Sequence, residues 1–222
     1  MTTPPLKTLL NTACIAGTIL SVAILVSGCG KSAPQAGDTA PKVRPVEAPQ
    51  PEPAPDLPPT VVIDTSMGSI EVTLWPDKAP GTVSNFLAYV DSGFYDALIF
   101  HRVIKGFMVQ GGGFESSMKQ KAAGTQIKNE ASVESPNNRG TIAMARTSDV
   151  DSATAQFFIN LVNNDFLNHR DATPRGFGYC AFGEVTAGMD VVDAIGSVAT
   201  GRKGMMENVP NEAVIIKTIR LK

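Results

Sequence analysis

The sequence predicts a mainly β domain over residues 60–222, built as a closed antiparallel barrel with two helices. Three observations lead to this class. Short runs rich in Val, Ile, Thr and Phe recur along the domain, and several alternate between apolar and polar positions. Only two stretches show helical periodicity. The domain also begins and ends in strand-like runs, and pairing these runs would close a barrel and remove exposed sheet edges.

The first elements are a hairpin and a helix. Thr60–Ser66 and Ser69–Trp75 have strand character, and the Met67-Gly68 step between them indicates a tight turn. Within Pro76–Tyr95, Pro80 suits a first helical turn. Apolar residues follow it at helical spacing, namely Val83, Phe86, Leu87 and Val90. Gly93 then comes where helices commonly end.

The most distinctive stretch is Phe100–Gly113, with the sequence F-H-R-V-I-K-G-F-M-V-Q-G-G-G. Alternation predicts a strand in which Phe100 and Arg102 face one way and His101 faces the other. We therefore expect His101 to be a packing residue and not an acid-base group. Gly106 interrupts the strand and indicates a bend that changes the direction of the following side chains.

The second half of this stretch adds an apolar patch and an amide. Phe107 and Met108 are followed by Gln110, so a guanidinium, an amide and an apolar patch lie close together in sequence. This combination suits a substrate that is apolar in one part and carries peptide carbonyls in another. We expect Gly111–Gly113 to form a turn that leaves the strand, because no phosphate-binding context follows it.

The rest of the domain is predicted to be mostly strands. Lys119–Ser135 is polar and is expected to be a loop, with Ile127 in a short strand. Asn163–Gly176 is expected to be a second loop. The predicted elements after Ser135 are the strands Gly140–Ala145, Gln156–Val162, Cys180–Val185 and Ala213–Leu221, and the helix Ala187–Ile195.

Composition excludes some classes of function. The net charge is −2 and no run is rich in Lys or Arg, so the chain does not have the basic surface of a nucleic-acid-binding protein. The cysteines Cys14, Cys29 and Cys180 have neither metal-ligand nor redox-motif spacing. We expect no metal and no cofactor, and we expect a monomer.

Residues 1–28 are predicted to be a lipoprotein signal peptide. Lys7 precedes the apolar run Ile15–Val26, which is shorter than the about 20 residues that span a bilayer. Leu25–Cys29 resembles the bacterial lipobox, which implies cleavage before Cys29 and lipid attached to its sulfur. Gly30 follows the cysteine, which favours the outer membrane over the inner. The alternative is an ordinary signal peptide with a chance cysteine.

Residues 29–59 are predicted to be a lipidated N-terminus and a disordered tether. This segment is rich in Pro and Ala and has few large apolar residues, so it cannot bury enough surface to offset the entropy of ordering. A spacer that holds the domain away from a membrane is the simpler interpretation. A docking site for a proline-binding module, or a substrate for the adjoining domain, is the alternative.

Four blocks of the domain resemble the cyclophilin family of peptidyl-prolyl cis/trans isomerases, in the family's order. They are Phe100–Gly113, Gly140–Ala145 (G-T-I-A-M-A), Ser152–Asn160 (S-A-T-A-Q-F-F-I-N) and Gly178–Met189 (G-Y-C-A-F-G-E-V-T-A-G-M). The resemblance implies an eight-stranded barrel with a helix over each open end. It also implies that the protein speeds rotation about X–Pro bonds, here during the folding of envelope proteins in the periplasm.

The resemblance implies a role for each matching residue. Arg102 corresponds to the catalytic arginine, and Gln110 to the amide that orients it and binds the peptide backbone. Ala145 and Gln156 correspond to the groove for the residue before proline. The proline pocket corresponds to Phe107, Met108, Phe158 and Leu167.

Three positions depart from the pattern of many eukaryotic cyclophilins. Phe166 replaces a tryptophan and Tyr179 aligns with a pocket histidine, and both are expected to bind substrate. Arg146 replaces an asparagine. These departures resemble bacterial cyclophilins and imply weak binding of cyclosporin with activity retained. Two alternatives to an isomerase are a non-catalytic chaperone or scaffold that grips proline-containing segments, and a barrel lipoprotein that binds a small ligand.

Overall fold

The computed structural model describes residues 57–222 of the chain. The predicted signal peptide and Cys29 lie outside the described residues, as does the Pro-rich segment up to residue 56. Between residues 57 and 222, no helix is both long enough and apolar enough to cross a membrane.

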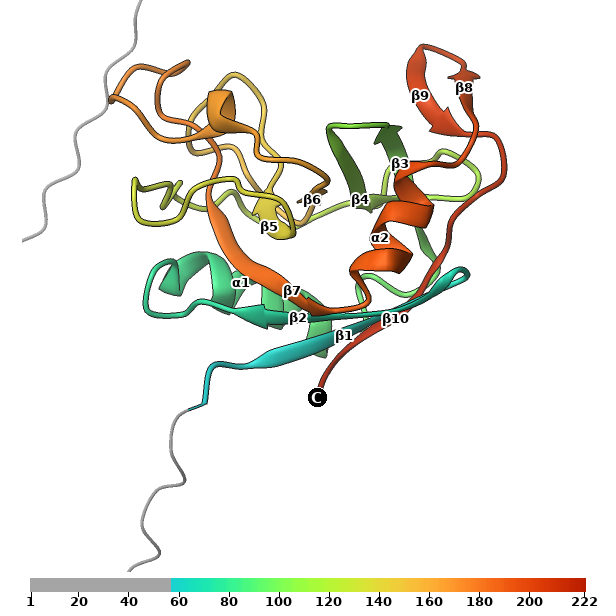
Figure 1. Cartoon of the computed structure of the whole chain (residues 1–222), viewed down its shortest axis with the longest axis horizontal. Coiled ribbons are helices and arrows are strands. Elements are labelled where there is room, and N and C mark those ends of the chain that lie inside the picture. The colour runs from blue at the N-terminus through green and yellow to red at the C-terminus, as the bar shows by residue number, and fades with distance from the viewer. Residues whose placement is uncertain (1–56) are drawn as a thin grey trace, which may run out of the picture. The chain divides into compact units, whose positions relative to one another are not determined.

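The described part is mainly β, as expected (Figure 1). Two α-helices, α1 (Pro80–Asp91) and α2 (Met189–Gly196), and a short 3-10 helix η1 (Asp165–Leu167) accompany the strands. The strands are β1 (Thr60–Thr65), β2 (Gly68–Leu74), β3 (Leu98–Ile104), β4 (Met108–Glu115), β5 (Thr141–Met144), β6 (Phe157–Asn160), β7 (Ala181–Ala187), β8 (Thr200–Lys203), β9 (Met206–Pro210) and β10 (Ile216–Leu221).

Eight strands form one antiparallel sheet that is nearly closed into a barrel. Their order is β10-β1-β2-β7-β5-β6-β4-β3, so the first strand pairs with the last, as predicted. The expectation of a fully closed barrel is wrong at one seam, between β3 and β10. The backbone contacts found there are an Ile99–Ile215 bridge and a hydrogen bond from the Phe100 N–H to the Val214 oxygen (3.0 Å). Both contacts fall at Val214 and Ile215, before β10 begins at Ile216, so β10 itself forms no ladder with β3.

Both helices bury their apolar faces in the same core. Helix α1 begins at Pro80 and buries Val83, Phe86 and Val90. The Gly93 N–H donates to the Val90 oxygen (3.0 Å), so the predicted stop at this glycine is confirmed. Helix α2 starts two residues later than expected, because β7 extends through Ala187 and Gly188 adopts a left-handed conformation before the helix.

The sequence analysis did not expect the β8–β9 hairpin. The two strands form a separate two-stranded sheet that lies next to β3. In the loop that precedes β5, Ile127 forms a single β-bridge, to Ala153, and is not part of a longer strand.

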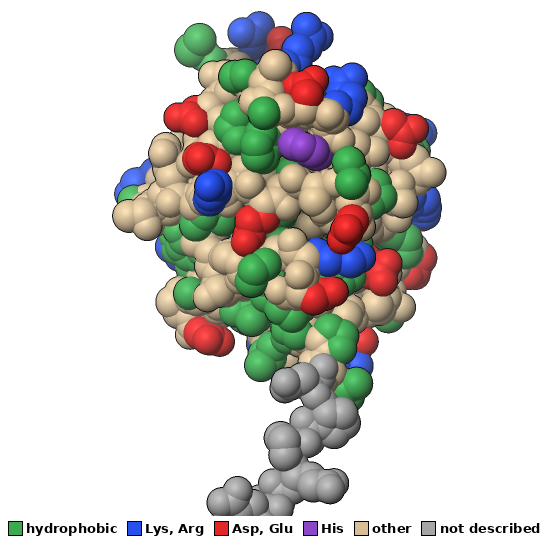
Figure 2. Space-filling view, turned by 90° about the vertical axis from the view of Figure 1, so that its left-hand side faces the viewer, with side chains coloured by type: hydrophobic (Ala, Val, Ile, Leu, Met, Phe, Trp, Pro, Cys, Tyr) green, Lys and Arg blue, Asp and Glu red, His purple; other side chains and the backbone are tan. Residues whose placement is uncertain are grey.

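Acidic and basic side chains are interspersed on the face shown in Figure 2. This face carries no extended surface of one charge, in keeping with the near balance of charge in the sequence.

Candidate active site

Arg102 and Gln110 face each other across strands β3 and β4, where they are register partners. The preceding pair joins Phe100 to Gly111, so His101 is an extra residue on β3 and forms a bulge. Phe100 lies in the main core, whereas Arg102 is half-buried and lines a cavity outside it. The expectation that Phe100 and Arg102 share a face is therefore wrong, because the bulge shifts the alternation by one residue.

His101 is a buried packing residue, as predicted. Its side chain is 2% exposed and its ring centre lies 4.5 Å from that of Phe114. Its Nδ1 has no hydrogen-bond partner among the described residues. Burial, together with the positive charge of Arg102, lowers the pKa of His101 to about 4. The imidazole is therefore neutral at pH 7, and Arg102 is the cation of this stretch that lines the cavity.

The three glycines continue strand β4, and the expectation of a turn there is wrong. A Cβ atom on Gly112 would come within 2.9 Å of the rings of Phe157 and Tyr95. A Cβ atom on Gly113 would lie 2.5 Å from Cγ of Gln156. Glycine is required here because core rings on one side and a glutamine on the other pass directly over the strand.

Apolar side chains form a cavity of about 270 Å³ beside Arg102. Met108, Phe158 and Leu167 are each at least nine-tenths buried and belong to an apolar cluster separate from the main core. Phe157 lies in the main core, so the two adjacent phenylalanines face opposite sides, as predicted. Nine of the ten predicted catalytic and substrate-binding residues line the cavity, namely Arg102, Phe107, Met108, Gln110, Ala145, Phe158, Phe166, Leu167 and Tyr179.

The tenth residue, Gln156, lies in an adjoining pocket and joins the site through hydrogen bonds. Arg102 Nη1 donates to Gln110 Oε1 (3.3 Å), and Gln110 Nε2 donates to Gln156 Oε1 (3.1 Å). This series of hydrogen bonds uses one N–H group of the Arg102 guanidinium and holds the guanidinium plane against β4. The other N–H groups of Arg102 make no hydrogen bond to a described residue. Several donors at the rim of the apolar cavity are therefore available to a bound ligand.

Arg146 also lines the cavity and has contacts that the sequence did not indicate. Its guanidinium lies over the Tyr179 ring, 4.7 Å from the ring centre. Its Nε, Nη1 and Nη2 donate to the carbonyl oxygens of Gly178, Thr147 and Pro174, each at 2.9 Å. Arg146, which the sequence indicated only as a departure from the family pattern, therefore links two loops by hydrogen bonds.

Three buried asparagines behind the cavity form a network that sequence reasoning missed. Asn137 Nδ2 donates to the carbonyl oxygens of Leu167 (3.2 Å) and Tyr179 (3.0 Å). Asn164 Nδ2 donates to the Phe107 oxygen (3.1 Å) and to Asn160 Oδ1 (2.7 Å). The network therefore holds the backbone at three residues of the cavity wall. The only indication of the network in the sequence was the residue type, because an amide side chain both donates and accepts hydrogen bonds and so suits a buried site where several backbone segments meet.

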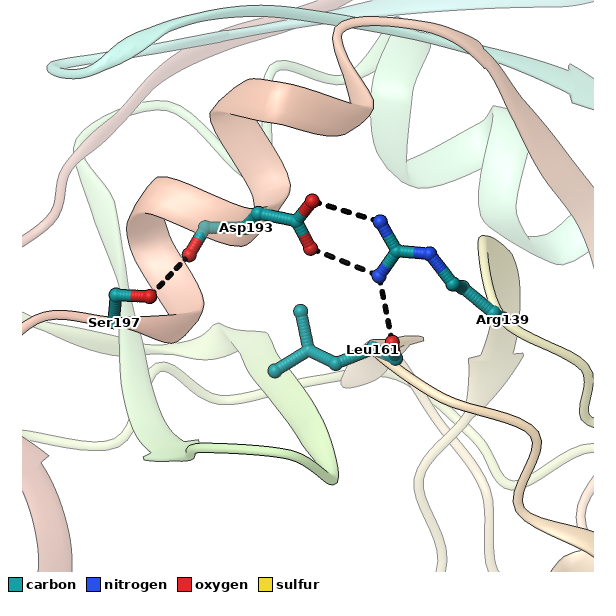
Figure 3. A network of polar contacts seen from close by, with 4 residues as sticks. All are labelled: Arg139, Leu161, Asp193 and Ser197. Carbon is teal, nitrogen blue, oxygen red and sulfur yellow. Dashed lines mark hydrogen bonds and ion pairs between the residues drawn. The ribbon is translucent and has the colours of Figure 1, made fainter.

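A surface ion pair ties α2 to the end of β6 near this network (Figure 3). Arg139 makes two parallel hydrogen bonds to the Asp193 carboxylate, at 2.9 and 2.7 Å, and Nη1 also donates to the Leu161 oxygen (2.7 Å). The pairing lowers the pKa of Asp193 and raises that of Arg139. Both side chains are close to half exposed, so we expect the pair to position the segment after β6 more than to stabilise the fold.

The site has the features of a binding cavity with fixed donors. Between residues 57 and 222, no three His, Cys, Asp or Glu side chains cluster closely enough to hold a metal ion. Cys180 is buried beside Thr82, and burial raises the pKa of its thiol to about 11. The residues that line the cavity offer apolar contact and hydrogen-bond donation from Arg102.

Comparison with known proteins agrees with this geometry. Residues 60–221 match the family model "Cyclophilin type peptidyl-prolyl cis-trans isomerase/CLD". The chain is 58% identical to peptidyl-prolyl cis-trans isomerase B of Escherichia coli over 159 residues, which cover 72% of this chain and 97% of that protein. It is 53% identical to the isomerase cyp18 of Streptomyces antibioticus, over 73% of this chain and 98% of that protein.

A solved structure is similar as well. A cyclophilin-type isomerase of Cryptosporidium parvum, crystallised in the presence of the dipeptide Ala-Pro, superposes with a TM-score of 0.60 at 26% identity, over 73% of this chain and 98% of that one. Because the matched region makes up nearly the whole of these relatives, we expect residues 60–222 to fold on their own. The chain belongs to the cyclophilin-type peptidyl-prolyl cis-trans isomerases.

Proposed function

We propose that this protein accelerates rotation about X–Pro peptide bonds in proteins of the bacterial cell envelope. Rotation about such a bond crosses a barrier of about 18–20 kcal/mol that arises from amide resonance. No bond is broken and no proton is transferred overall. An enzyme for this step needs an apolar slot for the proline ring and a donor directed at the imide nitrogen.

The placement of Arg102 at the rim of the apolar cavity is the observation that carries the proposal. As the X–Pro bond twists, its nitrogen becomes pyramidal and gains a lone pair that the planar ground state lacks. A guanidinium N–H donated to that lone pair stabilises the transition state more than the ground state. Gln110 holds the guanidinium in place before the substrate arrives.

The other cavity residues would hold the substrate. We assign the proline ring to the slot formed by Phe107, Met108, Phe158 and Leu167. The residue before the proline would lie along Ala145 toward Gln156, in the adjoining pocket of about 250 Å³. Phe166 is 61% exposed and Tyr179 half-buried, so both would form the outer rim.

The test is cis/trans exchange of a short Ala-Pro peptide, followed by NMR with residues 60–222. We expect the wild type to accelerate exchange and the Arg102→Ala variant to lose about 10²–10³ in kcat/KM, the usual effect of removing one preorganised donor. Circular dichroism establishes that the variant is folded. A folded Arg102→Ala variant with full activity would refute the role of Arg102. A variant that is inactive but still assists the folding of a client would favour the chaperone alternative.

The envelope location rests on the lipobox-like sequence before Cys29 and on the Pro-rich segment after it. We propose that lipid on Cys29 anchors the protein in a membrane, with the outer membrane favoured, and that the domain faces the periplasm as a monomer. Several acyl chains anchor a protein firmly, at roughly 0.8 kcal/mol per buried methylene. Cys29→Ser should abolish the incorporation of radiolabelled palmitate into the full-length protein, and a wild-type protein that takes up no label would rule out the lipid anchor.

A further inference from the structure

A groove that carries three arginines adjoins the proline cavity. It has a volume of about 810 Å³ and is lined in part by Arg146, Arg170 and Arg175. It shares Phe166, Leu167 and Tyr179 with the proline cavity, so a peptide seated in the cavity can extend into the groove. We call this surface the arginine groove.

No carboxylate lines the arginine groove. No Asp or Glu is among its lining residues, and none of its three arginines forms an ion pair within residues 57–222. Asp171 follows Arg170 in the chain and offsets part of its charge, since hydrogen bonds from Thr173 and also the charge of Arg170 lower the pKa of this carboxyl. Asp171 does not line the groove, so the three arginines together leave a positive charge that a ligand can use.

Arg146 fixes the geometry of the groove. Its guanidinium donates to carbonyl oxygens on both sides of Arg175, at Pro174 and Gly178, and is stacked on Tyr179. These acceptors are neutral, so the positive charge of Arg146 is not cancelled. Arg170 and Arg175 are exposed and remain able to contact a ligand.

The other pocket beside the proline cavity has a different character. Apart from Arg146, it is lined by uncharged residues, among them Gln110, Gln120 and Gln156. The proposed function places the residue before the proline on that side. The chain after the proline would then leave over Phe166 toward the arginine groove, which shares Phe166, Leu167 and Tyr179 with the cavity, and two or three extended residues reach about 7–11 Å.

We propose that the arginine groove binds an acidic side chain located two or three residues after the proline of the substrate. The inference rests on the proposed function of the neighbouring cavity and adds a preference for Asp or Glu at these positions. A Glu carboxylate there would meet Arg170 and Arg175 at the protein surface, where such pairs are screened by salt.

The experiment compares peptides of the form Ala-Ala-Ala-Pro-Ala-Xaa-Xaa-Ala by NMR exchange, with one Glu or one Lys in an otherwise all-Ala sequence. With residues 60–222 at low salt, we expect the Glu peptide to have a KM about fivefold lower than the Lys peptide, the effect of one or two exposed ion pairs. The difference should shrink at about 0.5 M salt. Moving the Glu or Lys to a position before the proline should abolish the difference in KM between the two peptides.

The matched variants are Arg170→Glu with Arg175→Glu, and Arg202→Glu as the control. Arg202 is an exposed arginine on β8 that lines neither cavity. The double variant should reverse the preference between the Glu and Lys peptides, and Arg202→Glu should preserve it. Equal KM values for the two peptides with the wild type, or a Glu preference that survives in the double variant, would overturn the inference. Failure to accelerate the all-Ala peptide would instead overturn the proposed function.

Discussion

Removal of the Asn137 side chain should weaken both the fold and the grip of the proline cavity. Asn137 is 1% exposed and holds two cavity residues, Leu167 and Tyr179, by their backbone oxygens. These residues lie in η1 and in the segment before β7, where no strand partner fixes the backbone on both sides. We therefore expect Asn137→Ala to let the cavity wall move.

The magnitude follows from the hydrogen bonds that remain. Asn137→Ala removes three donated bonds, one of them a long bond to Asn168 Oδ1 (3.5 Å), and the bond that Asn137 accepts from Asn160 (3.3 Å). The Leu167 oxygen keeps the Tyr179 N–H (2.9 Å), and Asn160 Nδ2 keeps the Thr141 hydroxyl (2.8 Å). Only the Tyr179 oxygen is left without a hydrogen-bond partner among the described residues. Three bonds of ordinary length at about 0.5–1.5 kcal/mol each, one long bond that adds little, and a buried carbonyl left unpaired predict a loss of about 3 kcal/mol in the free energy of unfolding.

Urea unfolding of residues 60–222 measures this loss, and Asn138→Ala is the matched control. Asn138 is exposed and its side chain makes no hydrogen bond with the described residues, so its removal should cost under about 0.5 kcal/mol. Peptide exchange should show a lower kcat/KM for Asn137→Ala, because a cavity wall that moves weakens the hold on the proline ring and shifts its nitrogen relative to Arg102. If Asn137→Ala unfolds at the same urea concentration as Asn138→Ala, the network does not support the cavity.

Two further predictions concern a helix cap and a buried histidine. The Glu130 carboxylate accepts hydrogen bonds from the N–H groups of Gly81 (3.0 Å) and Thr82 (2.7 Å) at the start of α1. Glu130→Ala should therefore lower the free energy of unfolding by about 2 kcal/mol. The exposed Glu134 of the same loop is the control, and equal urea midpoints for the two alanine variants would exclude the cap. The pKa of His101 is about 4 in the folded protein, against an ordinary value of 6.5 for histidine. Between these values the unfolded chain binds a proton that the folded chain does not, so stability should rise by about 3 kcal/mol from pH 4 to pH 6.5. His101→Phe should flatten this part of the profile, and an unchanged slope in the variant would assign it to other groups.

Features set by nearby residues could be predicted from the sequence. The α1 helix follows from Pro80, the apolar spacing after it and Gly93, all of which act within one or two turns. The hairpin of β1 and β2 follows from alternation on either side of Met67-Gly68. The membership of the cavity followed from a family pattern, and the structure brings those residues together.

Features set by contacts across the chain could not be predicted. The bulge at His101 depends on how β3 pairs with β4, and alternation in one strand does not contain the register. The strand at Gly111–Gly113 depends on Phe157, Tyr95 and Gln156, which pass over it from other parts of the chain. Locally, three glycines favour a turn. The contact that requires them is far away in the sequence.

The asparagine network explains how a rigid cavity is made from segments that are not strands. Apolar packing holds Leu167 and Phe158 together, but it is non-directional and allows small shifts. Donation from Asn137 and Asn164 fixes particular carbonyl oxygens, and buried polar groups left unpaired are costly, so each alternative arrangement is disfavoured. Catalysis by a fixed donor needs this order, because a shift of the proline ring would carry its nitrogen away from Arg102. The polar residues behind the cavity therefore bear on activity as directly as the apolar residues that line it.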